Sequence, residues 1–292
     1  MPTILLAGRS RLGAICPRCR AHLSTAFGRA PEIVIPLFGP PNVGKTRLMY
    51  MMIQVLLQWI HEQRGEVRYL DDARERLDMI ADALRSSLHT EKTLIGPGRA
   101  IGMYIKFGMH ARLVYFFDAA GEMYTSHDLL DELKYLNKAK TYIFVVDALC
   151  GKDVWTALPS VDRQRLQHFR TSDGELDRAF QATTGHMRKV RTGGRRFHTA
   201  RSDLAFVVSK LDILESAGLD TNAQTQQTSR WVSSETGLGL EDIARAADYA
   251  FDSVKYFCTA AIADEQGVDR TIWDLVNWIF SRSGVRMGAR PS

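Results

Sequence analysis

Cysteine is scarce and long apolar runs are absent from this chain of 292 residues. The longest apolar stretch, residues 48–60, is interrupted by Gln54 and Gln58, so it is too polar to span a bilayer. The run at residues 4–7 is too short for a secretory signal. The cysteines are too few and too unevenly spaced for a disulfide framework, which favours a reducing compartment; they are Cys16, Cys19, Cys150 and Cys258. We therefore expect a cytoplasmic protein that makes no membrane contact.

Neither sign of charge dominates the sequence. The formal net charge is +5 and the isoelectric point is about 9.0, a mild excess that suits anionic ligands without indicating nucleic acid. Hydrophobic residues make up 45% of the chain, which is enough to bury a full core. We interpret residues 1–30 as a short appendage, residues 31–285 as the main domain and residues 286–292 as a tail.

Strand-like runs alternate with helical stretches, a pattern that predicts an α/β fold with a mostly parallel sheet. Six strands are expected, at residues 32–38, 101–107, 111–118, 141–147, 203–209 and 254–259, the second and third forming a hairpin. Apolar spacing predicts helices over residues 45–63, 73–87, 126–137, 160–182, 240–250 and 271–281. The segments 65–100 and 185–201 resist placement and are interpreted as insertions or mobile elements.

The segment Gly-Pro-Pro-Asn-Val-Gly-Lys-Thr lies between an apolar strand and an apolar helix, which is the context of a phosphate-binding loop. Its glycines let backbone N–H groups turn toward phosphates, the lysine reaches the outer phosphates, and the threonine hydroxyl ligates Mg²⁺. A strand-to-helix turn would match this pattern by chance in only about one such chain in a hundred. The expected nucleotide-binding residues here are Gly39, Pro40, Pro41, Asn42, Val43, Gly44, Lys45, Thr46 and Arg47.

A carboxylate ends the expected strand at residues 111–118, where Asp118 is followed by Ala-Ala-Gly-Glu. Ligands bind at the carboxyl edge of open α/β sheets, so Asp118 is expected to hold Mg²⁺ and Gly121 to bond the γ-phosphate. Glu122 could orient or deprotonate the attacking water, although a solvated glutamate at a helix start fits the position nearly as well.

We therefore expect Lys45, Gly121 and Glu122 to be the catalytic residues. A second hydroxyl ligand for Mg²⁺ is expected on a loop before the hairpin. Thr90 and Thr93 are the candidates, and Thr93 is preferred because Leu-Ile-Gly-Pro-Gly follows it as a hinge-like stretch.

Another apolar strand leads into Ser209-Lys210-Leu211-Asp212. The Asp212 carboxylate can accept two hydrogen bonds from guanine, which adenine does not offer in the same arrangement, while the Lys210 stem could lie along the base. Backbone N–H groups of Thr259 and Ala260, near the end of the last expected strand, could contact the guanine oxygen. The alternative is a polar strand exit with Lys and Asp in solvent.

In the order GPPNVGKT, DAAGE, VVDA, SKLD and CTAA, these motifs resemble those of TRAFAC-class P-loop GTPases over residues 32 to about 281. The resemblance implies a Ras-like, three-layer fold around a mostly parallel six-stranded sheet with one antiparallel hairpin strand. The family pattern usually has Asn or Thr where this chain has Ser209. Within the class, DAAGE and the preceding Cys-containing piece are similar to the bacterial double-GTPase group, which implies a second GTPase subunit and a GTPase-activating-like protein as partners.

Members of that group often carry an N-terminal zinc ribbon with two cysteine pairs, whereas this chain has only the pair Cys16 and Cys19. Two cysteines cannot close a tetrahedral Zn²⁺ site, although His22 could be a third ligand. We expect a knuckle without zinc. Farther along, Arg188, Lys189, Arg191, Arg195, Arg196 and Arg201 form a basic stretch, interpreted as a solvated loop or as the source of an arginine that reaches a phosphate.

The leading hypothesis is a Mg²⁺-dependent molecular switch that binds GTP and hydrolyses it to GDP and phosphate. A nucleotide-binding scaffold with little hydrolysis is the first alternative, because Glu122 and Ser209 depart from the usual residues. An ATPase is the second, and it would leave the segment from Ser209 to Asp212 without a purpose.

Overall fold

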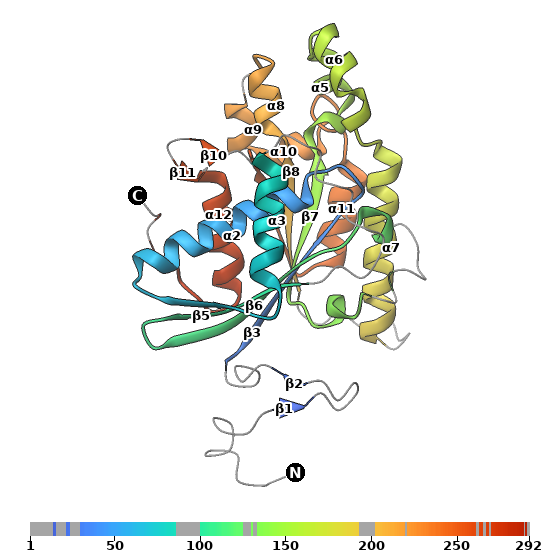
Figure 1. Cartoon of the computed structure of the whole chain (residues 1–292). Helices are drawn as coiled ribbons and strands as arrows, with labels where there is room; N and C mark the ends of the chain where they lie inside the picture. The colour runs from blue at the N-terminus through green and yellow to red at the C-terminus, as the bar shows by residue number, and fades with distance from the viewer. Residues whose placement is uncertain are drawn as a thin grey trace.

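The computed structural model shows a central sheet with helices on both faces (Figure 1). It describes residues 14–15, 22–23, 30–85, 100–124, 130, 133–192, 202–219, 221–260, 263–264, 267–268, 270–288 and 290. Among these residues, no helix combines the length and the apolar character needed to cross a membrane.

Seven strands form the sheet, in the order β4-β5-β6-β3-β7-β8-β9. Only β5 runs antiparallel to the others, and it pairs with both β4 and β6. The strands are β3 (Glu32–Phe38), β4 (Glu66–Tyr69), β5 (Ile101–Phe107), β6 (His110–Asp118), β7 (Thr141–Asp147), β8 (Asp203–Ser209) and β9 (Ser253–Cys258). The predicted α/β fold, mostly parallel with one antiparallel hairpin strand, is therefore confirmed.

The central strands β7 and β8 are buried at every position. Parallel strands covered by helices on both faces need continuous apolar runs rather than an alternating pattern, and residues 142–146 and 204–208 supply them. Each buried large apolar side chain stabilises the fold by about 1.5–3 kcal/mol relative to its exposed state. The centre of the sheet is thus a firm support for the loops that leave it.

Two groups of helices cover the sheet. On one face, α2 (Lys45–Glu62) packs against α3 (Ala73–Arg85) and α12 (Arg270–Arg282). On the other face, α7 (Asp173–Thr192) packs against α11 (Glu241–Ala250), as Figure 1 shows. The apolar residues of α12 lie on one arc of the helix and are buried; they include Ile272, Leu275, Val276 and Ile279.

Short elements gather beyond the carboxyl ends of β7 and β8, at the top of Figure 1. After β7 come η3 (Ala148–Cys150), α5 (Lys152–Ala157), α6 (Ser160–Leu166) and η4 (Gln167–Phe169). After β8 come α8 (Leu211–Ser216), α9 (Asn222–Gln226) and α10 (Thr228–Ser233). The segment between β6 and β7 includes η1 (Gly121–Tyr124) and η2 (Lys134–Asn137).

The structure corrects the expected element list in several places. The sheet has seven strands rather than six, because β4 adds an edge strand within the segment interpreted as an insertion. The helix expected over residues 160–182 is divided into α6 and α7, separated by η4. The segment 185–192 continues α7 and is not a loop. For the helix expected over residues 126–137, the described part contains only η2 and residue 130 in helical conformation.

Smaller antiparallel pairs join β1 (Ala14–Ile15) to β2 (His22–Leu23) and β10 (Ala263–Asp264) to β11 (Gly267–Val268). At the other end of the chain, Val285 and Met287 are buried, and the Trp59 indole donates a hydrogen bond to the Met287 carbonyl at 2.7 Å. The chain therefore packs onto α2 beyond residue 285. The division into appendage, domain and tail stays a prediction.

Candidate functional site

The loop between β3 and α2 has a backbone that tolerates few residue types. Gly39 has φ +145°, and a Cβ atom there would lie 2.5 Å from the Val145 carbonyl oxygen of β7. Asn42 and Gly44 are left-handed, with φ of 64° and 83°. The glycine at position 39 therefore permits a turn packed closely on the neighbouring strand.

Lys45 begins α2 with its ammonium turned back onto this loop. Only 7% of the side chain is exposed, and Nζ donates to the carbonyl oxygens of Gly39 at 3.0 Å and Pro40 at 2.8 Å. No described side chain caps the N-terminus of α2, and its first turn contains no acidic residue. Helix N–H groups, the positive end of the helix dipole and a buried ammonium together favour an anion at this place.

Asp118, the last residue of β6, lies beside the start of α2. In the sheet register it is the partner of Leu37 on β3, one residue before the strand ends. The Thr46 hydroxyl donates a hydrogen bond to Asp118 Oδ2 at 2.5 Å. Burial raises the pKa of Asp118, while the Lys45 ammonium and the Thr46 hydroxyl oppose that rise.

The other carboxylate oxygen, Asp118 Oδ1, is buried and accepts no hydrogen bond from any described residue. A buried carboxylate oxygen without a donor is costly, so this atom suits a cation. Mg²⁺ prefers oxygen ligands and commonly takes only one or two from the protein beside phosphates and water. The described residues contain no cluster of three or more His, Cys, Asp or Glu side chains, but the Thr46–Asp118 pair fits Mg²⁺.

Gly121 begins η1 directly against the phosphate-binding loop. A Cβ atom at this position would lie 2.3 Å from the Pro41 nitrogen and 2.5 Å from the Pro40 carbonyl carbon. The segment after Asp118 thus contacts the loop backbone itself. Glu122 also belongs to η1, but its side chain lies outside the described part of the structure, so its role in orienting water stays a prediction.

Tyr124, at the end of η1, is fully buried. Its hydroxyl donates to the Leu37 carbonyl oxygen at 2.7 Å and lies 3.1 Å from the Tyr135 hydroxyl. The bond from Tyr124 to Leu37 holds η1 against β3, the strand that precedes the phosphate-binding loop. No sequence signal indicated this contact.

The segment expected to read the base follows β8 at the same edge of the sheet. Ser209 is buried, and its hydroxyl lies 2.7 Å from the Val43 carbonyl oxygen and 2.9 Å from the Val146 carbonyl oxygen. A single hydroxyl proton is shared between two acceptors, one on the phosphate-binding loop and one on β7. Ser209 therefore ties the segment expected to read the base to the loop after β3.

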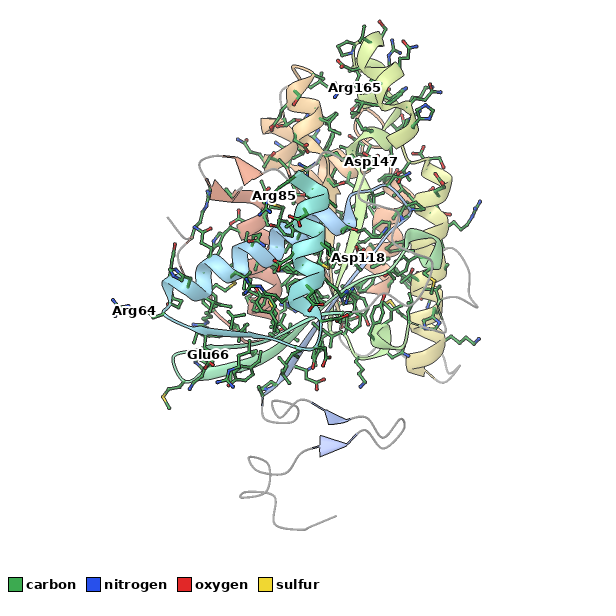
Figure 2. The ribbon with its side chains drawn as sticks, in the orientation of Figure 1. Arg64, Glu66, Arg85, Asp118, Asp147 and Arg165 are labelled. Carbon is green, nitrogen blue, oxygen red and sulfur yellow. The ribbon has the colours of Figure 1, made fainter. Side chains whose placement is uncertain are left out.

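Lys210 adopts a left-handed conformation, with φ +66°, immediately before α8. Its Nζ donates to Asp147 Oδ2 at 2.7 Å. Figure 2 labels Asp147 and Asp118, which end the strands on either side of β3. No role was predicted for Asp147, although it shows the same signal as Asp118, an acid that ends an apolar strand.

Asp212 lies in the first turn of α8 and is half-buried. Burial raises the pKa of Asp212, and the nearby Arg47 guanidinium opposes the rise. Arg47 and Asp212 were expected in separate motifs, one at the phosphates and one at the base. The fold brings them close enough for their charges to interact.

After β9, the Thr259 N–H donates to the Val208 carbonyl oxygen at 2.8 Å, and the Thr259 carbonyl accepts from the Leu211 N–H at 3.4 Å. These bonds hold the end of β9 against the base-reading segment. Because the Thr259 N–H is already bonded, Ala260 is the better candidate for the backbone contact with the base.

Several predicted site residues lie outside the described residues. They are Thr93, with its alternative Thr90, and the cysteines Cys16 and Cys19. Of the basic stretch, Arg188 and Lys189 are exposed on α7, whereas Arg195, Arg196 and Arg201 are not described. Cys150 and Cys258 are free and buried.

A family model described as Double-GTPase 2 matches residues 33–276 of the chain. The matched region begins in β3 and ends within α12, so it contains the loop after β3, Asp118, Asp147 and the segment after β8. No curated protein matches the chain.

Proposed function

Because the chain belongs to the Double-GTPase 2 family of P-loop GTPases, we propose that it is a Mg²⁺-dependent molecular switch that hydrolyses GTP to GDP and phosphate. The observation that carries this proposal is the Thr46–Asp118 pair, with a buried Asp118 oxygen that lacks a donor, beside Lys45 at the uncapped N-terminus of α2. The groups that would bind the cation and those that would bind the phosphates therefore lie side by side.

The triphosphate would bind where α2 begins. Backbone N–H groups of the loop from Gly39 to Thr46 and the Lys45 ammonium provide donors and positive charge. To reach a phosphate, Lys45 exchanges its bonds to the Gly39 and Pro40 carbonyl oxygens for bonds to phosphate oxygens. Before a nucleotide binds, the carbonyl contacts keep the ammonium at the site.

Thr46 and Asp118 would hold Mg²⁺, with Thr93 as the proposed second hydroxyl ligand. When bound, Mg²⁺ neutralises charge that develops on the β- and γ-phosphate oxygens. Gly121, which packs against the loop at Pro40 and Pro41, would sense the γ-phosphate through its N–H.

Guanine would be read by the carboxylate of Asp212 and by the backbone N–H of Ala260, with the Lys210 stem beside the base. Two hydrogen bonds from guanine to one carboxylate discriminate strongly against adenine, because an unpaired polar group in the site is costly.

Glu122 is the proposed residue that orients the attacking water for in-line displacement at the γ-phosphate. No arginine is assigned to the γ-phosphate, so intrinsic turnover should be slow and a protein partner should accelerate it. We further propose, from the resemblance of the sequence motifs to the double-GTPase group, that the partners include a second GTPase and a GTPase-activating-like protein of a bacterial system.

Single-turnover phosphate release from GTP tests the hydrolytic step. Wild-type protein with Mg²⁺ should release phosphate, and Lys45→Ala should reduce the rate by at least about a hundredfold. Lys106→Ala removes an exposed lysine at the opposite end of the sheet and should match wild type. GTP binding without phosphate release, even with candidate partner proteins added, would favour the scaffold alternative.

A further inference from the structure

Asp147 ends β7 as a fully buried carboxylate that accepts two hydrogen bonds. Oδ2 accepts from Lys210 Nζ at 2.7 Å, and Oδ1 accepts from the Leu149 N–H at 2.9 Å. In the sheet register, Asp147 stands opposite Ser209, the residue before Lys210.

Burying an ionised group is unfavourable unless partners compensate it, and a buried ion pair is seldom the most stable solution for a core position. A neutral side chain could end β7 at lower desolvation cost. The charge at position 147 is therefore better explained by the lysine that it holds than by the stability of the strand.

The conformation of Lys210 supports this explanation. A left-handed backbone is strained for a lysine, and this one comes directly before α8, whose first turn carries Asp212. The ion pair with Asp147 fixes the direction of the side chain at the point where the chain turns from β8 into α8. Any displacement of Lys210 would move the start of α8 with it.

The phosphate-binding loop is held by a different contact. Ser209 bonds to the Val43 carbonyl oxygen, and that bond does not involve Asp147. A substitution at Asp147 therefore leaves the bond between Ser209 and the phosphate-binding loop in place.

We propose that Asp147 is a positioning residue for base recognition, which acts by fixing Lys210 and the start of α8 relative to the base. The proposal rests on the proposed GTP-binding function. It predicts that loss of the Asp147 charge weakens binding of the base and leaves binding of the phosphates unchanged.

The test compares two ligands in the presence of Mg²⁺: GTP, and inorganic triphosphate, which has no base. Asp147→Asn keeps an oxygen that can accept from the Leu149 N–H but places an amide, which cannot replace the carboxylate charge, beside Lys210. We expect about tenfold weaker GTP binding and triphosphate binding within about twofold of wild type.

Asp203→Asn is the matched control. Asp203 forms a bidentate ion pair with Arg282, at 2.7 Å for both bonds, at the opposite end of β8. Loss of that pair should leave the ratio of GTP to triphosphate affinity at its wild-type value. A wild-type ratio in Asp147→Asn as well would overturn the positioning role.

Two further measurements keep the result interpretable. If Asp147→Asn does not fold, Asp147→Glu retains the charge but relocates Lys210, and its affinity ratio must still fall; a wild-type ratio rejects the proposal. If wild-type protein does not prefer GTP to ATP, the proposed function itself has failed. In a double-mutant cycle with Lys210→Met, the two effects should be clearly less than additive, whereas full additivity would contradict action through Lys210.

Discussion

At the scale of single residues, Gly121 leaves no room for a side chain, because three backbone atoms of Pro40 and Pro41 in the phosphate-binding loop occupy the space that it would need. Gly121→Ala would place Cβ 2.3 Å from the Pro41 nitrogen, and neither backbone can yield without moving the loop. We expect a loss of about 1–3 kcal/mol in the free energy of unfolding, together with weaker GTP binding. Denaturant unfolding and nucleotide titration would measure both.

Gly174→Ala provides the comparison for that substitution. Gly174 lies in the first turn of α7, and a Cβ atom there would meet nothing within 4 Å. Alanine should stabilise the helix by about 0.5–1 kcal/mol. Equal effects of the two substitutions would contradict the packing described for Gly121.

The ionisation of Asp212 gives a second prediction at this scale. Burial raises the pKa of Asp212 and Arg47 opposes the rise, so Arg47→Ala should raise this pKa further. Guanine needs the ionised carboxylate as acceptor. The preference for GTP over ATP should therefore be complete at pH values above the pKa of Asp212 and should be lost as the pH falls through that pKa. In Arg47→Ala the loss should occur at a higher pH. An unchanged midpoint in the variant would remove Arg47 from this role.

Among the elements, α2 depends on a segment far from it in the sequence. The indole of Trp59 is buried and donates to the Met287 carbonyl oxygen. Ending the chain at Val285 would leave this donor without its acceptor, at a cost of about 1–3 kcal/mol in the free energy of unfolding. A chain that ends at Gly288 should retain wild-type stability. If the two truncated chains have the same free energy of unfolding, residues 286–287 do not stabilise the domain and belong to the tail.

The strands show how far the sequence alone could predict the elements. All six predicted strands agree with β3, β5, β6, β7, β8 and β9 to within one residue at each end. The signal is clearest for β7 and β8, which are buried at every position and therefore read as continuous apolar runs. β4 was missed because it is a four-residue edge strand, Glu-Val-Arg-Tyr, in which no residue is fully buried. A short exposed strand obtains its partner from the tertiary structure, which composition does not reveal.

The division between α6 and α7 did have a signal in the sequence. Ser172 and Glu175 form a capping box, in which the Ser172 N–H donates to Glu175 Oε2 at 3.0 Å and the Glu175 N–H donates to Ser172 Oγ at 3.3 Å. The pattern Ser-x-x-Glu marks a helix start. Just before it, Arg170 bonds to the carbonyl oxygens of Leu149 and Cys150, contacts that no local pattern predicts.

At the scale of the whole molecule, the candidate site exists only because the parallel sheet brings separate segments to one edge. The loop after β3, Asp118 at the end of β6 and the segment after β8 are far apart in sequence. They lie at the ends of strands that are neighbours, or nearly neighbours, in the sheet. The positions of the motifs at the carboxyl ends of the expected strands were enough to predict this meeting. They were not enough to predict the contacts of Ser209, Lys210 and Asp147, which depend on side-chain direction.

The most direct test of the account is Mg²⁺-dependent binding of labelled GTP and ATP to wild-type protein and to Asp212→Ala. We predict at least about tenfold preference for GTP in the wild type. This preference should be lost in Asp212→Ala, and chelation of Mg²⁺ should weaken GTP binding to both proteins. Equal affinities for GTP and ATP in the wild type, or an undiminished preference in the variant, would contradict the assignment of Asp212 to base recognition.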